Sequence, residues 1–161
     1  MAMHNIHLKK QLPYTVEELM ALALDVEAYN EFVPFCERCV VREQFERQGR
    51  DVMVAAMTVG VSVFNETFVS RVISDEQAKT IRVTGIDGPL NALVNNWEFK
   101  PQDSGGTEID FSVSFEFRSR MLSMLASSRV EDVCNRILDA FVERAHELYG
   151  PPSAVNAPRS A

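Results

Sequence analysis

The sequence has few cysteines and no long apolar run, and each absence excludes a class of protein. Three cysteines in 161 residues do not suggest the disulfide framework of a small secreted domain. No apolar run approaches the roughly 18 residues that mark a transmembrane helix. The first five residues have neither the charged start nor the apolar core of a secretory signal. We therefore predict a cytoplasmic protein, or one that lies peripherally at the inner face of the membrane.

Positive charge is also scarce. Sixteen Lys and Arg residues stand against 23 Asp and Glu residues, which gives a net charge of −7 and a pI of about 5.0. A general nucleic-acid binder draws its affinity from neutralising phosphates, so this balance disfavours such a protein, and we expect no DNA partner. Binding to RNA would need a basic edge from one of two groups: Arg38, Arg42, Arg47 and Arg50, or Lys79 and Arg82.

Motifs for catalysis are missing as well. The chain has no G-x-S-x-G, no H-E-x-x-H and no P-loop. Its acidic residues fall on the expected solvent faces, as for Asp110 and Glu116 in a strand and Asp132 and Asp139 in a helix. We therefore predict no catalytic residue and a protein that is not an enzyme.

Cys36 and Cys39 form a C-x-x-C pattern between a proline-containing loop and an expected strand. A redox motif would sit at a helix start in a βαβ unit, which is not predicted here. A structural zinc site needs four ligands, and His4, His7 and His146 show no paired spacing. We interpret the two cysteines as buried or half-buried thiols and predict no metal site.

Residues 119–149 carry the pattern of one long amphipathic helix. Gly150 followed by two prolines ends it. About 29 residues would form a rod of roughly 43 Å, which needs a partner surface of matching length. Its apolar stripe consists of Met121, Leu125, Val130, Val133, Ile137, Phe141, Ala145 and Leu148.

The chain before this helix reads mainly as strands. Residues 6–12 predict a short edge strand, and Thr15 with Glu18 forms a capping box that predicts a helix start. Asp25 could cap a second, shorter helical turn. From residue 39 to 117 turn signals separate strand-like segments, with boundaries at 47–50, 75–77, 87–89 and 103–106. The last segment alternates most clearly between apolar and polar residues, as in an antiparallel sheet with one covered face.

Strands followed by a long helix indicate the α+β class, with the helix laid over one face of the sheet. We predict a curved antiparallel sheet of six to seven strands with two short helices after the first strand. Residues 1–150 would form a single domain, and residues 151–161 a disordered tail.

An apolar set rich in aromatic residues and methionine suits either a solid core or a pocket for a flexible hydrocarbon. It comprises Met53, Met57, Val59, Phe64, Trp97, Phe99, Phe111, Phe115, Met121, Met124 and Phe141. Four polar residues lie within expected strands: Asn65, Arg71, Asn95 and Asn96. At least one of them could point inward, where it would need a hydrogen-bond partner in the protein or in a ligand.

Seven stretches, in this order, resemble the coenzyme Q-binding proteins of the START-like superfamily. The bacterial branch of that family includes ribosome-association toxins and polyketide cyclase-like proteins, and the resemblance covers residues 5–150. The stretches are Leu12-Pro13-Tyr14-Thr15, Phe32-Val33-Pro34-Phe35-Cys36, Val69-Ser70-Arg71-Val72, Asp87-Gly88-Pro89-Leu90, Asn96-Trp97-Glu98-Phe99-Lys100-Pro101, Phe115-Glu116-Phe117-Arg118 and Ala140-Phe141-Val142-Glu143-Arg144-Ala145.

The resemblance implies a helix-grip fold, in which the sheet wraps around the long helix and leaves a cavity. The 32–36 loop would form the cavity's lid or mouth, while Cys39 and residues 91–95 depart from the family pattern. The ligand-binding residues that we expect are Val33, Pro34, Phe35, Met57, Val59, Phe64, Trp97, Phe99, Phe111, Phe115, Met121, Leu125, Val133, Ile137 and Phe141.

The function that the resemblance implies is non-enzymatic binding of ubiquinone or a similar polyprenyl ligand, in support of respiration or quinone biosynthesis. Ubiquinone would be a bound ligand and not a redox cofactor, and a transient contact with a membrane surface would accompany its exchange. An alternative is a translation inhibitor that binds the large ribosomal subunit. A weaker alternative is a polyketide cyclase-like enzyme, which would need an acid or base that projects into the cavity.

Overall fold

The computed structural model describes residues 3–61, 64–126 and 128–150, except for the side chains at positions 61, 64, 125 and 126. The expected disordered tail, 151–161, lies outside the described residues. In chain order the elements are β1 (His4–Leu12), α1 (Val16–Leu24), the 3₁₀ helix η1 (Val26–Glu31), β2 (Cys36–Arg47), β3 (Arg50–Val61), β4 (Phe64–Asp75), β5 (Thr80–Asp87), β6 (Leu90–Pro101), β7 (Thr107–Phe117), α2 (Arg120–Ala126) and α3 (Val130–Tyr149).

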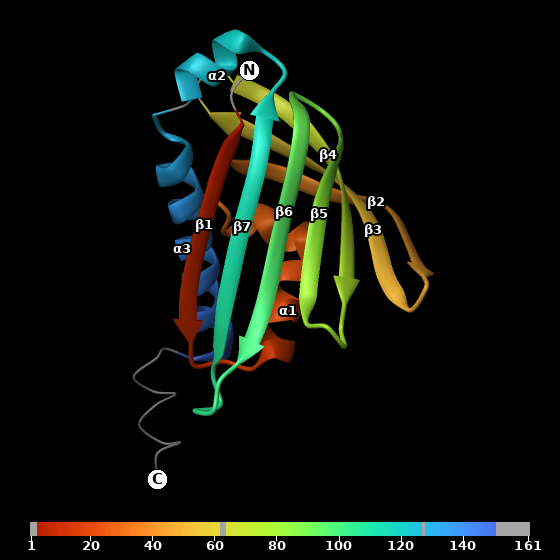
Figure 1. Cartoon of the computed structure of the whole chain (residues 1–161), viewed down its shortest axis with the longest axis vertical. Coiled ribbons are helices and arrows are strands. Elements are labelled where there is room, and N and C mark those ends of the chain that lie inside the picture. The colour runs from red at the N-terminus through yellow and green to blue at the C-terminus, as the bar shows by residue number, and fades with distance from the viewer. Residues whose placement is uncertain (1–2, 62–63, 127, 151–161) are drawn as a thin grey trace.

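The strands form one seven-stranded antiparallel sheet in the order β1-β7-β6-β5-β4-β3-β2. The sheet is strongly twisted, and α1 and α3 lie on the same face, behind it in Figure 1. This arrangement confirms the predicted α+β helix-grip fold. The first strand lies at an edge, as predicted, and begins at His4.

The turn signals in the sequence mark real turns. Gln48 and Gly49 form a two-residue connection between β2 and β3 with φ values of 54° and 77°, as the primed hairpin turns require. Gly88 has φ of 128° in the turn between β5 and β6, and a Cβ there would lie 2.8 Å from the Thr67 carbonyl oxygen. The backbone at this second turn therefore favours glycine both for its angle and for its space.

The helix starts are only partly as predicted. The Thr15 hydroxyl accepts the Glu18 backbone N–H at 3.1 Å, and the Glu18 carboxylate accepts the Thr15 backbone N–H at 3.0 Å, so the capping box before α1 is confirmed. The second helical turn exists as η1, but the Asp25 side chain makes no capping hydrogen bond there. Asp25 is therefore a junction between the two helices and not a side-chain cap.

The prediction of one uninterrupted helix over 119–149 is wrong. The chain forms α2 and α3 with a turn at Ser128 and Arg129, and α3 has 20 residues, about 30 Å. Serine competes for backbone hydrogen bonds and favours turns, which gives a physical reason for the turn at Ser128. Met121 is 70% exposed and Leu148 is 51% exposed, so the buried stripe is shorter than predicted.

Within the described residues, no helix combines the length and apolar character needed to cross a membrane. The described core lies between the concave face of the sheet and the helices α1, η1 and α3. Leu138 and Ala145 of α3 are fully buried in it.

Candidate functional site

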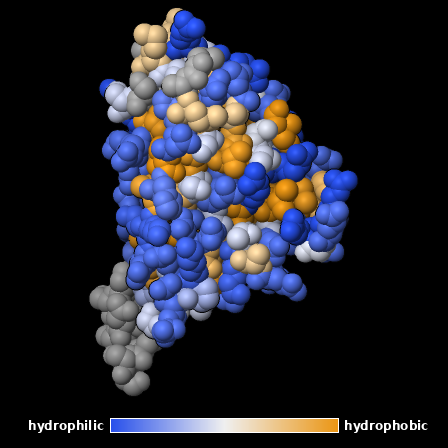
Figure 2. Space-filling model, in the orientation of Figure 1, coloured by the Kyte–Doolittle hydropathy of each residue, from blue (hydrophilic) through white to orange (hydrophobic). Residues whose placement is uncertain are grey.

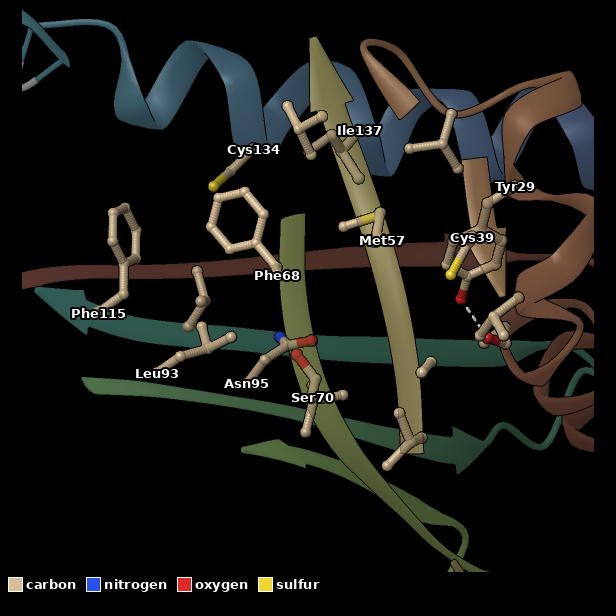
Figure 3. Close-up of a pocket in the computed structure, with 18 of the residues that line it drawn as sticks. Tyr29, Cys39, Met57, Phe68, Ser70, Leu93, Asn95, Phe115, Cys134 and Ile137 are labelled. Atoms are coloured by element: carbon tan, nitrogen blue, oxygen red, sulfur yellow. Dashed lines mark hydrogen bonds between the residues drawn. The ribbon is translucent and has the colours of Figure 1, made fainter. Parts of the chain in front are cut away.

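A cavity of about 350 Å³ lies between the sheet and α3 (Figure 3). Its lining is almost entirely hydrocarbon or aromatic. The lining residues are Ala23, Val26, Tyr29, Val33, Cys39, Ala55, Met57, Val59, Phe68, Ser70, Val72, Ile81, Val83, Leu90, Leu93, Asn95, Trp97, Phe111, Val113, Phe115, Phe117, Val133, Cys134, Ile137 and Phe141. Among these described residues there is no Asp, Glu, His, Lys or Arg, so the lining offers neither a carboxylate nor a permanent cation.

The sheet wall of the cavity follows from the two-residue period of strands. Leu93, Asn95 and Trp97 of β6 all line it, and so do alternate residues of β7 from Phe111 to Phe117. Side chains two residues apart share one face of a sheet, so the alternation in the sequence sets this wall.

The opposite wall is formed by α3 and by the segment that follows α1. Val133, Ile137 and Phe141 recur at helical spacing and line the cavity. The Phe141 ring packs edge-on against Trp97 at 5.3 Å between ring centroids. This aromatic contact joins the helix to the sheet at one end of the cavity.

Tyr29 of η1 closes the same end. Its ring packs edge-on against Phe141 with centroids 5.2 Å apart, and its hydroxyl donates to the Ala23 carbonyl oxygen (Figure 3). Burial raises the pKa of the Tyr29 hydroxyl well above its usual range, so this group stays neutral. Tyr29 therefore presents mainly its ring to the cavity.

Two thiols, Cys39 and Cys134, line the cavity, and Cys36 is buried nearby in β2. A register shift between Cys36 and Arg38 lets Cys36 and Cys39, three residues apart, both be buried. Burial raises the pKa of Cys39 to about 12 and that of Cys134 to about 11, so both are thiols at neutral pH. The interpretation of the C-x-x-C pair as buried thiols is confirmed, and no group of three or more metal-ligand side chains occurs in the described part of the chain.

Two polar side chains interrupt the hydrocarbon wall, Asn95 of β6 and Ser70 of β4. Trp97 Nε1 donates to Asn95 Oδ1 at 2.7 Å, and Asn95 Nδ2 donates to the Ser112 carbonyl oxygen at 2.9 Å. The expectation that one polar strand residue points inward is met by Asn95. Its neighbour Asn96 instead accepts a hydrogen bond from Arg82.

The cavity brings together most, but not all, of the residues predicted to bind a ligand. Nine of them line it: Val33, Met57, Val59, Trp97, Phe111, Phe115, Val133, Ile137 and Phe141. Their contact with a ligand stays a prediction.

Four predicted residues lie elsewhere. Phe99 is 2% exposed and packs beside Trp97 in the core, away from the cavity lining. Met121 is exposed on α2. Pro34 and Phe35 are in the 32–36 loop but do not line the cavity, and Phe35 lies under the Arg136 guanidinium, 5.7 Å from its ring centroid. The side chains of Phe64 and Leu125 lie outside the described residues.

Sequence reasoning missed several lining residues. The inward positions Leu93, Val113 and Phe117 follow from the alternation of β6 and β7 and could have been found from it. Tyr29 and Phe68 carry no comparable signal, because their position depends on how η1 and β4 pack against distant parts of the chain.

A comparison with protein-family models matches residues 12–142 to the family described as polyketide cyclase / dehydrase and lipid transport. The chain is 31% identical over 155 residues to a mitochondrial coenzyme Q-binding protein, COQ10, of Drosophila melanogaster. That match covers 93% of this chain and 62% of the fly protein, so the chain spans less than two thirds of that relative.

A second relative is the ribosome association toxin RatA of Escherichia coli K12, which is 28% identical over 139 residues. This match covers 86% of the chain and 84% of the toxin. Among solved structures, an 18 kDa protein of Caulobacter crescentus superposes with a TM-score of 0.75 at 31% identity. The superposition covers 91% of this chain and 99% of the Caulobacter protein.

Proposed function

Because the chain belongs to the polyketide cyclase / dehydrase and lipid transport family, we propose that it is a non-enzymatic carrier of ubiquinone or a similar polyprenyl lipid. The ligand would occupy the cavity between the sheet and α3. One observation carries this proposal: a cavity of about 350 Å³ is present, and no ionisable acid or base of the His, Lys, Arg, Asp or Glu type lines it among the described residues. The name of the Drosophila relative, a coenzyme Q-binding protein, supports the same ligand class.

The energetics favour a hydrocarbon tail in such a site. Each buried CH₂-sized group contributes roughly 0.8 kcal/mol, so one five-carbon isoprene unit contributes about 4 kcal/mol. The cavity volume lies near the lower end of the range for small-molecule sites, about 300–1,000 Å³. The site is therefore suited to a ring with the first part of a tail, and a longer tail would extend beyond the cavity.

A membrane surface is the natural place for exchange of such a lipid, and α2 is the element that we propose contacts it. Met121 and Met124 are 70% and 74% exposed on α2. Arg120 and Arg129 flank them in the sequence, and both are exposed. Figure 2 shows pale orange residues beside strongly hydrophilic ones at the end where Figure 1 places α2. Exposed apolar residues beside arginine suit the boundary between lipid tails and anionic headgroups.

The test is lipid extraction from the purified chain. The protein is expressed in a host that makes ubiquinone, purified without detergent, extracted with organic solvent, and the extract is analysed by mass spectrometry. We expect ubiquinone with the wild type, less with Ile137→Trp, which fills the cavity, and an unchanged amount with Glu143→Trp, which adds the same ring on the exposed side of α3. Absence of bound quinone, together with failure to bind added quinone, would refute the proposal.

A second candidate function is ribosome binding, which the similarity to the toxin RatA favours. The arginines available for it lie on the edge strand β2, where Arg38, Arg42 and Arg47 are interspersed with three glutamates. Arg50, at the start of β3, is paired with Asp75 at 3.2 Å. Because this edge has no excess of positive charge, we rank ribosome binding second. Sedimentation with large ribosomal subunits at low salt, lost at high salt, would reverse this order.

We do not propose a cyclase activity. Such an enzyme would need an acid or base in the cavity, and the polar side-chain groups of the described lining are thiols, a tyrosine hydroxyl, a serine hydroxyl, an amide and the Trp97 indole N–H. The Tyr29 hydroxyl is already committed to a backbone carbonyl oxygen.

A further inference from the structure

The amide of Asn95 is held in one orientation on the cavity wall. The indole Nε1 of Trp97 can only donate a hydrogen bond, so the atom that it contacts at 2.7 Å must be the amide oxygen. The amide nitrogen then faces the Ser112 carbonyl oxygen at 2.9 Å, which can only accept. These two bonds use one of the two N–H donors and one of the two lone pairs of the amide. One donor and one lone pair remain for a partner.

Ser70 lies on the same wall, on β4, which is separated from β6 by β5. Asn95 is paired with Val83 on β5, and Ser70 is paired with Gly85 on the same strand. Val83 and Gly85 are two residues apart and so share a face of the sheet. Both polar side chains belong to the cavity lining and lie near each other in Figure 3.

Gly85, the β5 partner of Ser70, lies close to Leu93. A Cβ at this position would lie 3.1 Å from Leu93 Cβ, which is a tight contact. Leu93 lines the cavity two positions before Asn95 on β6, so a side chain at position 85 would press on this part of the wall. An apolar wall with two neighbouring polar side chains, Ser70 and Asn95, suits a ligand with one polar end and an otherwise apolar surface.

We propose that Asn95 and Ser70 form a head-group subsite that hydrogen-bonds an oxygen of the ligand's ring, so that the ligand binds with its ring against β4–β6 and its tail along the apolar remainder of the cavity. This inference rests on the proposed lipid-binding function and specifies the ligand class: an apolar molecule with a carbonyl or hydroxyl oxygen on a neutral ring. A fatty acid does not meet these requirements, because the described lining has no cation to pair with its carboxylate. The donor and the lone pair left on Asn95 accommodate both a ring carbonyl and a ring hydroxyl.

The subsite predicts different affinities for two ligands of equal apolar size, one with a ring oxygen and one without. A ring oxygen that pairs with the wall should improve binding by roughly 2- to 12-fold per hydrogen bond relative to a ligand without it. A plain hydrocarbon in the same place would leave the remaining Asn95 donor and the Ser70 hydroxyl covered and unpaired.

The experiment uses the full chain after removal of bound lipid, with two probes. The first is a ubiquinone with two isoprene units, and the second is a benzene ring that carries the same two-unit tail but no oxygen. Trp97 is the only tryptophan and lines the cavity, so its fluorescence reports binding of the quinone, and the hydrocarbon is measured by competition. The variants are Ser70→Ala, Asn95→Ala and, as a matched control, Asn96→Ala, because Asn96 bonds Arg82 instead of lining the cavity.

We expect the wild type to bind the quinone several-fold more tightly than the hydrocarbon. Ser70→Ala and Asn95→Ala should lose this preference, with hydrocarbon binding equal or tighter because no polar group there is left covered and unpaired, and Asn96→Ala should keep it. Asn95→Ala also removes the partner of Trp97, so Ser70→Ala provides the cleaner test if that variant folds poorly. If both variants keep the preference, or the wild type shows none, the subsite is refuted while the carrier function stands. If the wild type binds neither probe, the carrier function itself is refuted, and the subsite with it.

Discussion

Replacing Ala55 with leucine tests whether the space between sheet and helix is a true cavity. Ala55 is buried on β3, lines the cavity and is paired with Ser70 on β4. In a filled core, the three extra carbons of leucine would have to displace neighbouring atoms, which typically costs 1–3 kcal/mol. In a cavity of about 350 Å³ they enter empty space. The sign of the change in unfolding free energy therefore separates the two cases.

The expected magnitude follows from the area that the added carbons bury. Three carbons at about 0.8 kcal/mol each give up to about 2.4 kcal/mol. Loss of leucine rotamer freedom offsets about 0.5–1 kcal/mol of this, which leaves a stabilisation of about 1.5 kcal/mol. For a domain of this size that corresponds to a rise in Tm of roughly 3–6 °C. Binding of the two-unit quinone should weaken at the same time, because the added side chain occupies ligand space next to Ser70.

The matched control is Ala145→Leu, the same change at a fully buried position of α3 that does not line the cavity. Here we expect a destabilisation of about 1–3 kcal/mol from overpacking. Both variants are measured by urea denaturation of lipid-free protein, with stability taken from the midpoint at constant slope. If Ala55→Leu destabilises the protein as much as Ala145→Leu does, the cavity closes in solution and the reasoning is refuted.

Three further predictions concern the cap, the thiols and α2. Thr15→Ala should lower the unfolding free energy by about 1 kcal/mol in urea titrations, because it removes the side-chain cap of α1, whereas Thr15→Ser should not. Burial raises the pKa of the Cys39 thiol from 9.0 to about 12, so its contribution to the unfolding free energy is complete below pH 9 and is lost as pH rises toward 12. Cys39→Ala should make the fall of unfolding free energy with pH less steep, and an equal pH dependence in the variant would contradict this prediction. Replacing Met121 and Met124 together with serine should reduce flotation with anionic vesicles without lowering Tm, since both side chains are mostly exposed, and unchanged flotation would remove α2 as the membrane contact.

Much of the fold could be predicted because local signals and the final structure agree. The alternation of residues 107–117 predicts one covered face, and β7 buries alternate residues along most of its length. The Gln48-Gly49 turn and the capping box at Thr15 are short-range features whose geometry depends on a few neighbouring residues. Such features are visible in sequence because distant contacts are not needed to define them.

The break between α2 and α3 is a feature that the apolar pattern concealed. Met121 fits the helical stripe by spacing, but its side chain is exposed. Hydrophobic periodicity indicates which residues could share a helix face, and it does not say whether the sheet extends far enough to cover them. The serine-rich segment after α2 was the sequence signal that favoured a break.

The kinds of residue that form the site could be predicted from the sequence, but which of them line the cavity could not. Trp97 and Phe99 both lie on the covered face of β6, yet only Trp97 lines the cavity, while Phe99 packs beside it. Alternation places both side chains inward and cannot distinguish a wall from solid packing, since that depends on how far α3 stands from each strand. The same limit explains why Asn95 could be expected to point inward, while its bond to Trp97 had to come from the structure.

The strand order also has a consequence for how the chain is synthesised. His4 of β1 is paired with Phe115 of β7, 111 positions later, so β1 has no strand to pair with until β7 has emerged. At a translation rate of 5–20 residues per second, this wait lasts roughly 5–20 s. The hairpins from β2 to β6 can pair in turn during that time, and the cavity cannot form until β7 and α3 have been synthesised and pack together with them. Any partner that shields nascent apolar surface would therefore be needed until β7 and α3 have emerged.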